Sequence, residues 1–375
     1  MEKKKKVFVG LSGGVDSAVS ALLLKRQGYD VTGVFIKVWT PDFLPCTWRE
    51  ERRDAMRVAV ALDIPFISLD FSEEYKRDVV DYIVEEYKKG RTPNPDVMCN
   101  RAIKFGAFLR EARARGADFI ATGHYARCVS RDSVSDLRKE VLSSADDQRG
   151  KFATDKSSFL LQEGEDPNKD QSYFLWTLRE EDLPHILFPI GNLKKSEVRA
   201  LAKGAHLPVA EKRDSQGICF IGDVSMDEFL SHFVSTEQGS VLNTQGEVIG
   251  VHNGALHYTI GERHGFTVTK KGTSDKPYFV VAKDMIENTI TVSNEDVEIE
   301  ALSPSRVEMS NVNWITNPEG RNLSARIRYR QEKVPVRVEG EKVTFSAPVR
   351  GLSFGQSIVF YDGDICVGGG IMERS

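Results

Sequence analysis

The strongest constraint on the fold is the regular alternation of short apolar segments with helix-patterned segments along residues 7–124. Strands separated by helices at this pitch predict a parallel sheet whose connections are crossover helices. We therefore expect an α/β domain at the start of the chain. The expected strands are Val7–Leu11, Val31–Val38, Ile64–Leu69 and Asp118–Thr122, and the expected helices are Ala18–Gln27, Glu50–Leu62, Asp78–Lys88 and Ile103–Arg115.

The pattern changes twice further along the chain. Residues 130–165 are polar, lack periodicity and are rich in Ser and Asp, which predicts a surface insertion. From about residue 240, short strand patterns are broken by Gly, Asn and Asp, as in an all-β barrel or sandwich. We expect three parts: an α/β catalytic domain over 1–222, a small linking domain over 223–277, and a β-barrel over 278–375.

Composition excludes several classes of protein. The chain has 375 residues, a formal net charge of −4, 40% hydrophobic and 28% charged residues, as in a soluble protein of two or three domains. Its apolar runs are shorter than the roughly 20 residues that span a membrane. Five scattered cysteines without a CxxC pair fit a reducing compartment. We expect a cytoplasmic protein with no membrane association.

A candidate phosphate loop lies between the first expected strand and the first helix. Its glycines permit a tight turn with exposed N–H groups, two serines add hydroxyl donors, and the helix start favours an anion. Asp16 would repel phosphates unless it holds Mg²⁺ or the helix start. The alternative is a plain strand-to-helix turn. The loop residues are Gly10, Leu11, Ser12, Gly13, Gly14, Val15, Asp16 and Ser17.

Two cysteines lie in segments rich in Gly, Pro and Asp, which are typical of functional loops. We expect a helix to begin near Ala102, so that Cys99 lies close to its start, where a thiolate is favoured. Asp96 is a candidate proton acceptor or donor. The alternative is that Cys99 is a small buried residue in a cap. From its neighbours alone, Cys219 is strand packing, and the sequence does not show that the two cysteines meet.

The stretch 321–350 is basic, with eight Arg or Lys against three Glu. Arg326, Arg328 and Arg330 alternate along an expected strand, which places three cations on one face. Such a face would contact RNA phosphates without reading sequence. The alternative is an ordinary solvated sheet face.

Taken together, several motifs resemble those of the tRNA-specific 2-thiouridylases, a family in the superfamily of N-type ATP pyrophosphatases. The resemblance covers the whole chain except the stretch near 130–152. The motifs are GLSGGVDS (10–17), NPDVMCN (94–100), TGHYAR (122–127), NKDQSYFL (168–175), DSQGICFIG (214–222), RYRQ (328–331) and GQ (355–356).

The resemblance implies a role for each matching residue. The domain would be adenine nucleotide α-hydrolase-like, with ATP on the loop and with Ile36 and Gly123 lining the adenosine pocket. Asn94, Pro95 and Asp96 would meet the target base, and Cys99, Cys219 and Asp96 would be catalytic. The residues expected to bind tRNA are His124, Lys169, Asp170, Gln171, Arg328, Tyr329 and Gln356.

The implied reaction replaces an oxygen of RNA with sulfur. ATP would adenylate the C2 oxygen of the wobble uridine, and persulfide sulfur from a carrier protein, received on Cys219, would displace AMP. The attacking group would be either the persulfide itself or sulfide freed from it by Cys99. Cys99 would be the second thiol, leaving a transient Cys99–Cys219 disulfide, and Mg²⁺ would accompany ATP without a metal site of the protein's own. Two alternatives remain: an ATP pyrophosphatase acting on a small metabolite, and an RNA-binding protein whose nucleotide loop is only structural.

Overall fold

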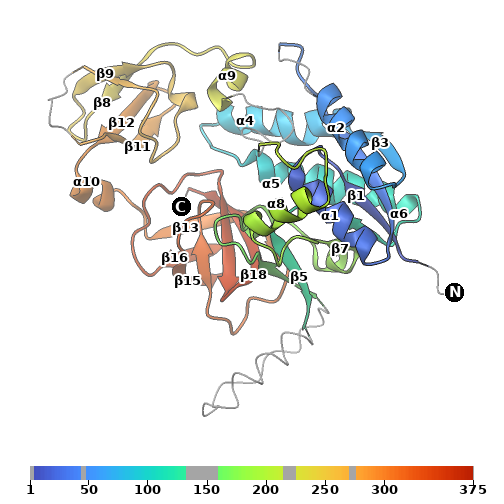
Figure 1. Cartoon of the computed structure of the whole chain (residues 1–375). Coiled ribbons are helices and arrows are strands. Elements are labelled where there is room, and N and C mark those ends of the chain that lie inside the picture. The colour runs from blue at the N-terminus through green and yellow to red at the C-terminus, as the bar shows by residue number, and fades with distance from the viewer. Residues whose placement is uncertain (1–3, 44–47, 132–158, 214–224, 270–275, 375) are drawn as a thin grey trace.

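The structure is a computed structural model, and it describes residues 4–43, 48–131, 159–213, 225–269 and 276–374. Figure 1 shows an α/β domain, a small β domain and a β-barrel as three lobes. Cys46 and Cys219 lie outside the described residues.

The α/β domain is built on a five-stranded parallel sheet, which confirms the predicted fold class. Its strand order is β3-β2-β1-β4-β7. Val9 in the central strand pairs with Gly33 and Ala121 and is completely buried. The strands are β1 (Lys6–Gly10), β2 (Asp30–Lys37), β3 (Phe66–Asp70), β4 (Phe119–Ala121) and β7 (Ile186–Leu187).

Helices cover this sheet, and two of the helical runs contain a π-helical stretch. The first run continues from α3 through η1 to α4, and the second from α5 through η2 to α6. The bounds are α1 (Val15–Arg26), α2 (Trp48–Ala61), α3 (Ser72–Tyr75), η1 (Lys76–Asp81), α4 (Tyr82–Lys88), α5 (Pro95–Cys99), η2 (Asn100–Ala107), α6 (Phe108–Ala114) and α8 (Lys195–Gly204). The 3₁₀ helices η3 (Ser172–Leu175) and η4 (Glu180–His185) follow later in the domain.

The helix expected near Ala102 begins earlier, at Pro95. The Asn94 side-chain oxygen accepts hydrogen bonds from the N–H groups of Asp96 (3.1 Å) and Val97 (3.2 Å). An Asn cap followed by Pro at the first helical position is a favourable start, because proline lacks the N–H that would be left unpaired there. Cys99 is therefore the fifth residue of the helix, and its expected place at the helix start is wrong.

Part of the expected surface insertion at 130–165 is a strand. Strand β5 (Ala126–Ser130) pairs antiparallel with β6 (Phe159–Glu163), and β6 pairs in turn with β18 (Ile365–Glu373) of the barrel. This part of the prediction is wrong, because residues 159–163 join the α/β domain to the barrel sheet. Residues 132–158 lie outside the described residues.

The small β domain extends beyond the expected boundary at residue 277. Its sheet has the order β10-β9-β8-β12-β11, and β12 pairs in parallel with β8. Residues 279–293 thus belong to this sheet and not to the barrel. Its elements are α9 (Met226–Ser231), β8 (Gly239–Leu242), β9 (Val248–His252), η5 (Ala255–His257), β10 (Thr267–Val268), β11 (Phe279–Asp284) and β12 (Thr289–Ser293).

The C-terminal strands form a closed β-barrel, as the sequence predicts. The strand order β13-β16-β15-β14-β17-β18 is closed by pairing of β18 with β13. Val343, Ile358 and Phe360 are completely buried inside it. The bounds are α10 (Asp296–Ala301), β13 (Arg306–Trp314), β14 (Ser324–Arg326), β15 (Val334–Glu339), β16 (Lys342–Phe345), β17 (Ser357–Asp362) and β18.

Candidate functional site

The expected phosphate loop lies at the carboxyl end of β1, where parallel sheets bind ligands. Gly13 has φ +76°, and a Cβ added there would lie 2.6 Å from the carbonyl oxygen of Glu51. Only glycine fits this turn. The Ser12 hydroxyl accepts from the N–H of Gly14 (3.3 Å), and the Ser17 hydroxyl donates to the Gly14 carbonyl (3.1 Å). The two serines therefore hold the shape of the loop.

Asp16 is neutralised by a residue that the sequence analysis missed. Its carboxylate accepts from the Lys195 ammonium at 2.8 and 2.9 Å and from the Tyr125 hydroxyl at 2.8 Å. Lys195 is the first residue of α8, and nothing in its local pattern distinguishes it from its lysine neighbours. Because this cation is held beside the loop, Asp16 does not face incoming phosphates as an unpaired negative charge.

Gly123 packs directly against the loop, as expected for a residue of the nucleotide pocket. It follows β4, and a Cβ added to it would lie 2.8 Å from the backbone nitrogen of Ser17. Ile36 is buried in β2 and belongs to the same apolar cluster as Cys99. The structure thus brings Gly123 to the loop and places Ile36 in the apolar core of the α/β domain.

His124 is buried rather than displayed to an RNA. Its Nδ1 lies 2.8 Å from the Thr122 hydroxyl, and its ring packs against Phe105 and Phe188. Burial lowers the pKa of His124 well below its ordinary value, and the charge of Lys104 lowers it further. The imidazole is therefore neutral at physiological pH.

Four of the expected substrate-binding residues come together at one cavity, where the α/β domain, the small β domain and the barrel meet. This junction cavity has a volume of about 330 Å³. Sequence reasoning had placed Asn94, Arg328, Tyr329 and Gln356 in the site, and it missed the other lining residues, Thr92, Tyr173, Thr259 and Glu262. The local sequence signal for Glu262 is the glycine before it, since Gly261 adopts φ +87° in a turn.

Arg328 ties the small β domain to the barrel. Its guanidinium donates to the carbonyl oxygens of Ile260 and Gly351. A Cβ on Gly261 or on Gly351 would lie 3.3 Å from the Arg328 Nη2, so both glycines make room for it. Burial lowers the pKa of Arg328, although the group stays charged at neutral pH.

Hydrogen bonds from all three domains surround the cavity. The Gln356 amide donates to the carbonyl oxygen of Pro93 (3.4 Å), and the hydroxyl groups of Thr92 and Thr259 lie 3.3 Å apart. Burial raises the pKa of the Glu262 carboxyl, and the Thr259 N–H that it accepts (2.9 Å) opposes this rise. A polar lining of this kind suits a flat polar ligand such as a nucleobase.

The expected tRNA-binding triplet 169–171 is split in the structure. Asp170 is buried and accepts from the N–H groups of Gly164 (3.0 Å) and Ser172 (3.1 Å). Gln171 accepts from the Tyr125 N–H at 3.0 Å, and Lys169 is half-buried. Asp170 therefore organises this turn from within, and its carboxylate does not lie on the surface.

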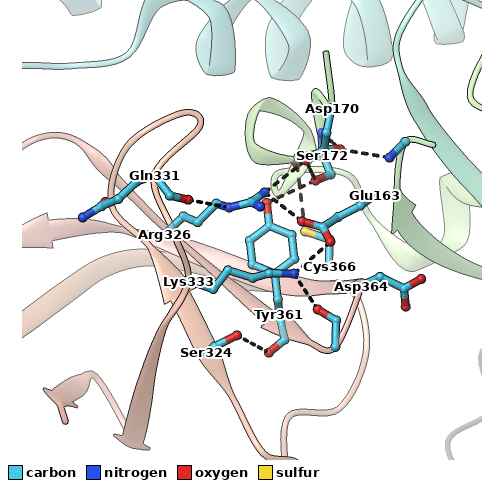
Figure 2. A network of polar contacts seen from close by, with 12 residues as sticks. Glu163, Asp170, Ser172, Ser324, Arg326, Gln331, Lys333, Tyr361, Asp364 and Cys366 are labelled. Atoms are coloured by element: carbon cyan, nitrogen blue, oxygen red, sulfur yellow. Dashed lines mark hydrogen bonds and ion pairs between the residues drawn. The ribbon is translucent and has the colours of Figure 1, made fainter. Parts of the chain in front are cut away.

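The expected row of arginines along one strand face is wrong. Strand β14 ends at Arg326, and Arg330 has φ +63°, so the strand does not continue through them. Arg326 lies inside a polar network with Glu163 (2.8 Å) and Asp170 (3.1 Å), which Figure 2 shows. Its positive charge is used to join the barrel to the α/β domain.

Three cysteines, Cys99, Cys128 and Cys366, lie within the described residues. Cys99 is completely buried in the apolar core of the α/β domain. Burial raises the pKa of Cys128 to about 12 and also raises that of Cys366, as expected for packing residues. Cys219 lies outside the described residues, but Lys212, near the start of its segment, pairs at 2.8 Å with Asp54, the residue that packs on Gly13.

Comparison with known proteins decides the family. A family model described as "tRNA methyl transferase HUP domain" matches residues 5–223, followed by a "tRNA methyl transferase PRC-barrel domain" at 227–294 and an "Aminomethyltransferase beta-barrel domain" at 305–372. The "tRNA-specific 2-thiouridylase MnmA 2" of Geobacillus kaustophilus (strain HTA426) is 44% identical over 98% of this chain and 95% of its own length. The chain belongs to the tRNA-specific 2-thiouridylase family.

Other members of the 2-thiouridylase family match as completely. The MnmA protein of Streptococcus thermophilus (strain ATCC BAA-491 / LMD-9) is 44% identical over 99% of this chain and 96% of its own length. That of Enterococcus faecalis (strain ATCC 700802 / V583) is 42% identical over the same shares. The resemblance found in the motifs is thus confirmed along the whole chain.

Within the described ranges, none of the helices is long and apolar enough to cross a membrane. The same residues contain no cluster of three or more His, Cys, Asp or Glu side chains able to hold a metal ion.

Proposed function

We propose that this protein is an ATP-dependent tRNA-uridine 2-sulfurtransferase, which converts the wobble uridine of tRNA to 2-thiouridine. The observation that carries the proposal is the glycine-fitted loop at the end of β1, with Asp16 neutralised by Lys195, in a chain 44% identical to 2-thiouridylases over 98% of its length. Other members of the family bear this activity in their names.

ATP makes the uridine oxygen a leaving group. The C2 oxygen attacks the α-phosphate, pyrophosphate departs, and the new C2–O–AMP bond converts a poor leaving group into a good one. The residues proposed to hold ATP are the loop Gly10–Ser17, Gly123 and Ile36. Mg²⁺ is proposed to arrive with the phosphates, because such ions keep water ligands and take only one or two carboxylates.

Sulfur arrives as a persulfide on Cys219, donated by a carrier protein. The terminal sulfur attacks C2 and expels AMP, after which the Cys99 thiolate attacks the Cys219 sulfur. This step releases C2=S and leaves a Cys99–Cys219 disulfide, which an external thiol reduces. Support comes from Lys212, the residue seven positions before Cys219, which pairs with Asp54 beside the phosphate loop.

The junction cavity is the proposed place for the target uridine. Asn94 uses its side-chain oxygen as the helix cap, so its amide N–H groups are the part that would donate to the base. Pro95 and Asp96 continue from it into the helix of Cys99. The base must leave its stack to enter such a cavity, as in other enzymes that act on a nucleobase.

The remaining tRNA contacts are proposed for Lys169, Gln171, Tyr329 and Gln356. Arg328 would support them by fixing the small β domain against the barrel. Asp170 and His124 are both buried, and we propose for them a positioning role. A cytoplasmic location follows from the proposed tRNA substrate.

The test is a reaction with ATP, Mg²⁺, a persulfide donor and unmodified tRNA, read by nucleoside mass spectrometry. We expect ATP-dependent 2-thiouridine, its loss in Cys219→Ser with ATP and tRNA binding kept, and its loss in Cys99→Ala when the donor is a persulfide. Methylated uridine instead would favour the activity named in the family-model descriptions. AMP formed with a small acceptor, or tRNA binding without any AMP, would favour the two alternative functions.

A further inference from the structure

A second cavity, of about 560 Å³, lies between the helical run η2–α6, the segment 176–182 and strand β13 of the barrel. We call it the arginine groove, because Arg101, Arg110, Arg113 and Arg179 line it. Asp182 is the acidic residue in its lining, and its carboxylate already pairs with the Arg179 guanidinium at 2.7 Å. The groove therefore has a clear positive excess in a chain of net charge −4.

The π-helical turn of η2 brings these arginines together. Arg101 and Arg110 are nine residues apart, so an α-helix of 3.6 residues per turn would point them to nearly opposite sides. The wider turns of η2, over Asn100–Ala107, change this phase, and both side chains line the same cavity. π-helical turns are rare and are frequent at functional sites.

The charges of three of the arginines are not used by the fold. Arg101, Arg110 and Arg113 are exposed, and among the described residues none of them has a carboxylate at salt-bridge distance. Arg115, on the same helical run, is instead paired with Glu111 at 2.7 Å. Thr177 also lines the groove. Its hydroxyl oxygen is buried and has no hydrogen-bond partner in the described structure.

The opposite wall is irregular in a way that suits a ligand. The pairing of β13 with β18 shifts register between Ser310 and Asn313, and Asn311, inside this bulge, has φ +50°. A bulge leaves backbone groups outside the ladder and is common beside functional sites. Asn313 also fixes the neighbouring segment, donating to the carbonyl oxygens of Trp176 (2.7 Å) and Leu178 (2.8 Å).

The arginine groove and the junction cavity follow the same seam between the α/β domain and the barrel. The run α5–α6 contributes Asn94 to the junction cavity and Arg101 to the groove. The segment after Ser172 contributes Tyr173 to the first and Thr177 to the second. The two cavities are therefore lined by the same two segments of the chain, at positions seven residues apart in the first segment and four residues apart in the second.

We infer that the arginine groove binds the ribose–phosphate backbone of the RNA strand whose base enters the junction cavity. This inference rests on the proposed function. Guanidinium groups bind phosphate oxygens in pairs, and such contacts position an RNA without reading its sequence. A strand is favoured over a folded acidic protein because the arginines lie inside a concave cavity, where a flexible phosphate chain reaches them and a convex protein surface does not.

The test compares Arg110→Gln/Arg113→Gln with Arg115→Gln as the matched control. Fluorescence titrations with unmodified tRNA are made at several salt concentrations, with ATP affinity and melting temperature measured alongside. We expect the double variant to bind tRNA about tenfold or more weakly and to lose about two units of the slope of log K against log salt. Its ATP affinity should match that of the control.

An unchanged salt slope in the double variant would overturn the inference. If that unchanged slope came with weaker binding of inorganic phosphate, the groove would be a site for a free anion. If it came with loss of sulfur delivery from a protein donor but not from sulfide, the groove would dock an acidic protein. Failure of the unaltered protein to bind tRNA would contradict the proposed function and this assignment together.

Discussion

At the scale of single residues, the pairing of Lys195 with Asp16 governs the charge that ATP meets. The ammonium is 15% exposed and lies 2.8 Å from the carboxylate. We expect Lys195→Ala to weaken ATP binding about tenfold, or about 1.4 kcal/mol, because it leaves Asp16 uncompensated beside the phosphates. Isothermal titration with ATP measures this change.

The control for this prediction is Lys203→Ala, in the same helix, where the lysine pairs with Glu211 on the surface. Adding Asp16→Asn to Lys195→Ala should restore part of the lost affinity, since it removes the charge that Lys195 balanced. Equal affinities for Lys195→Ala and the control would show that the pair has no role in nucleotide binding.

Gly13 and Gly28 flank the same helix and separate backbone strain from crowding. Both have positive φ, +76° and +90°, but a Cβ on Gly28 meets nothing within 4 Å, whereas one on Gly13 strikes the Glu51 carbonyl. We expect Gly28→Ala to cost about 1 kcal/mol of stability and to leave ATP binding unchanged. Gly13→Ala should cost more and should abolish ATP binding. Thermal melting with and without ATP compares them.

Lys283 should make stability depend on pH. Burial lowers its pKa to about 8, and Glu262 opposes the lowering. The unfolded chain keeps its ordinary pKa of about 10.4 and binds more protons between pH 8 and 10, so the free energy of unfolding rises with pH in that window. Below pH 8 the folded protein carries the full cost of the buried charge.

Lys283→Met should remove this dependence. At pH 7 we expect the free energy of unfolding of the variant to exceed that of the unaltered protein by on the order of 2 kcal/mol, and we expect this difference to disappear by pH 10. Urea unfolding at each pH gives the difference, and Lys276→Met, an exposed lysine, is the control. A constant difference between variant and parent across this range would argue against the buried charge.

At the scale of elements, sequence patterns predicted what local periodicity determines. Strands β1 to β4 and helices α1 and α2 were expected within a few residues of their observed bounds, while β7 was not predicted. The helix at Pro95 was expected too late, because proline suits a loop as well as the first position of a helix. The sequence prediction assigned strands β11 and β12 to the barrel. It missed the pairing of β12 with β8, because that contact joins residues far apart in the sequence.

The joint between β6 and β14 is the element-scale contact that sequence could not show. The sequence alone predicts a surface position for Arg326, but in the structure its guanidinium pairs with both Glu163 and Asp170 (Figure 2). We expect Arg326→Met to lower the free energy of unfolding by about 3 kcal/mol, because the buried Asp170 carboxylate loses its charged partner and the half-buried Glu163 keeps only Lys333 among the described residues. Urea denaturation measures the loss.

Arg337→Met, on the neighbouring strand β15, is the control, since Arg337 is 80% exposed and pairs with Glu339 at the surface. It should change stability by less than about 0.5 kcal/mol. Arg326→Met should also keep the salt slope of tRNA binding. A reduced slope with full stability would restore the original expectation of a phosphate contact.

At the scale of the whole molecule, the site is a product of three lobes. Sequence motifs predicted Asn94, Arg328, Tyr329 and Gln356 as binding residues, and the structure gathers them at one cavity. Thr259 and Glu262 were missed because the small β domain reaches this place only through its packing, with Arg328 held between Gly261 and Gly351. Motifs mark residues, but the fold determines which surfaces meet.

The central claim is that ATP activates the C2 oxygen of uridine so that sulfur can replace it. The most direct measurement uses tRNA carrying ¹⁸O at C2 of the wobble uridine, with ATP and a persulfide donor. We expect the heavy oxygen to appear in the phosphate group of AMP, one for each 2-thiouridine formed. Thiolation with unlabelled AMP, or with the label released into water, would contradict the account.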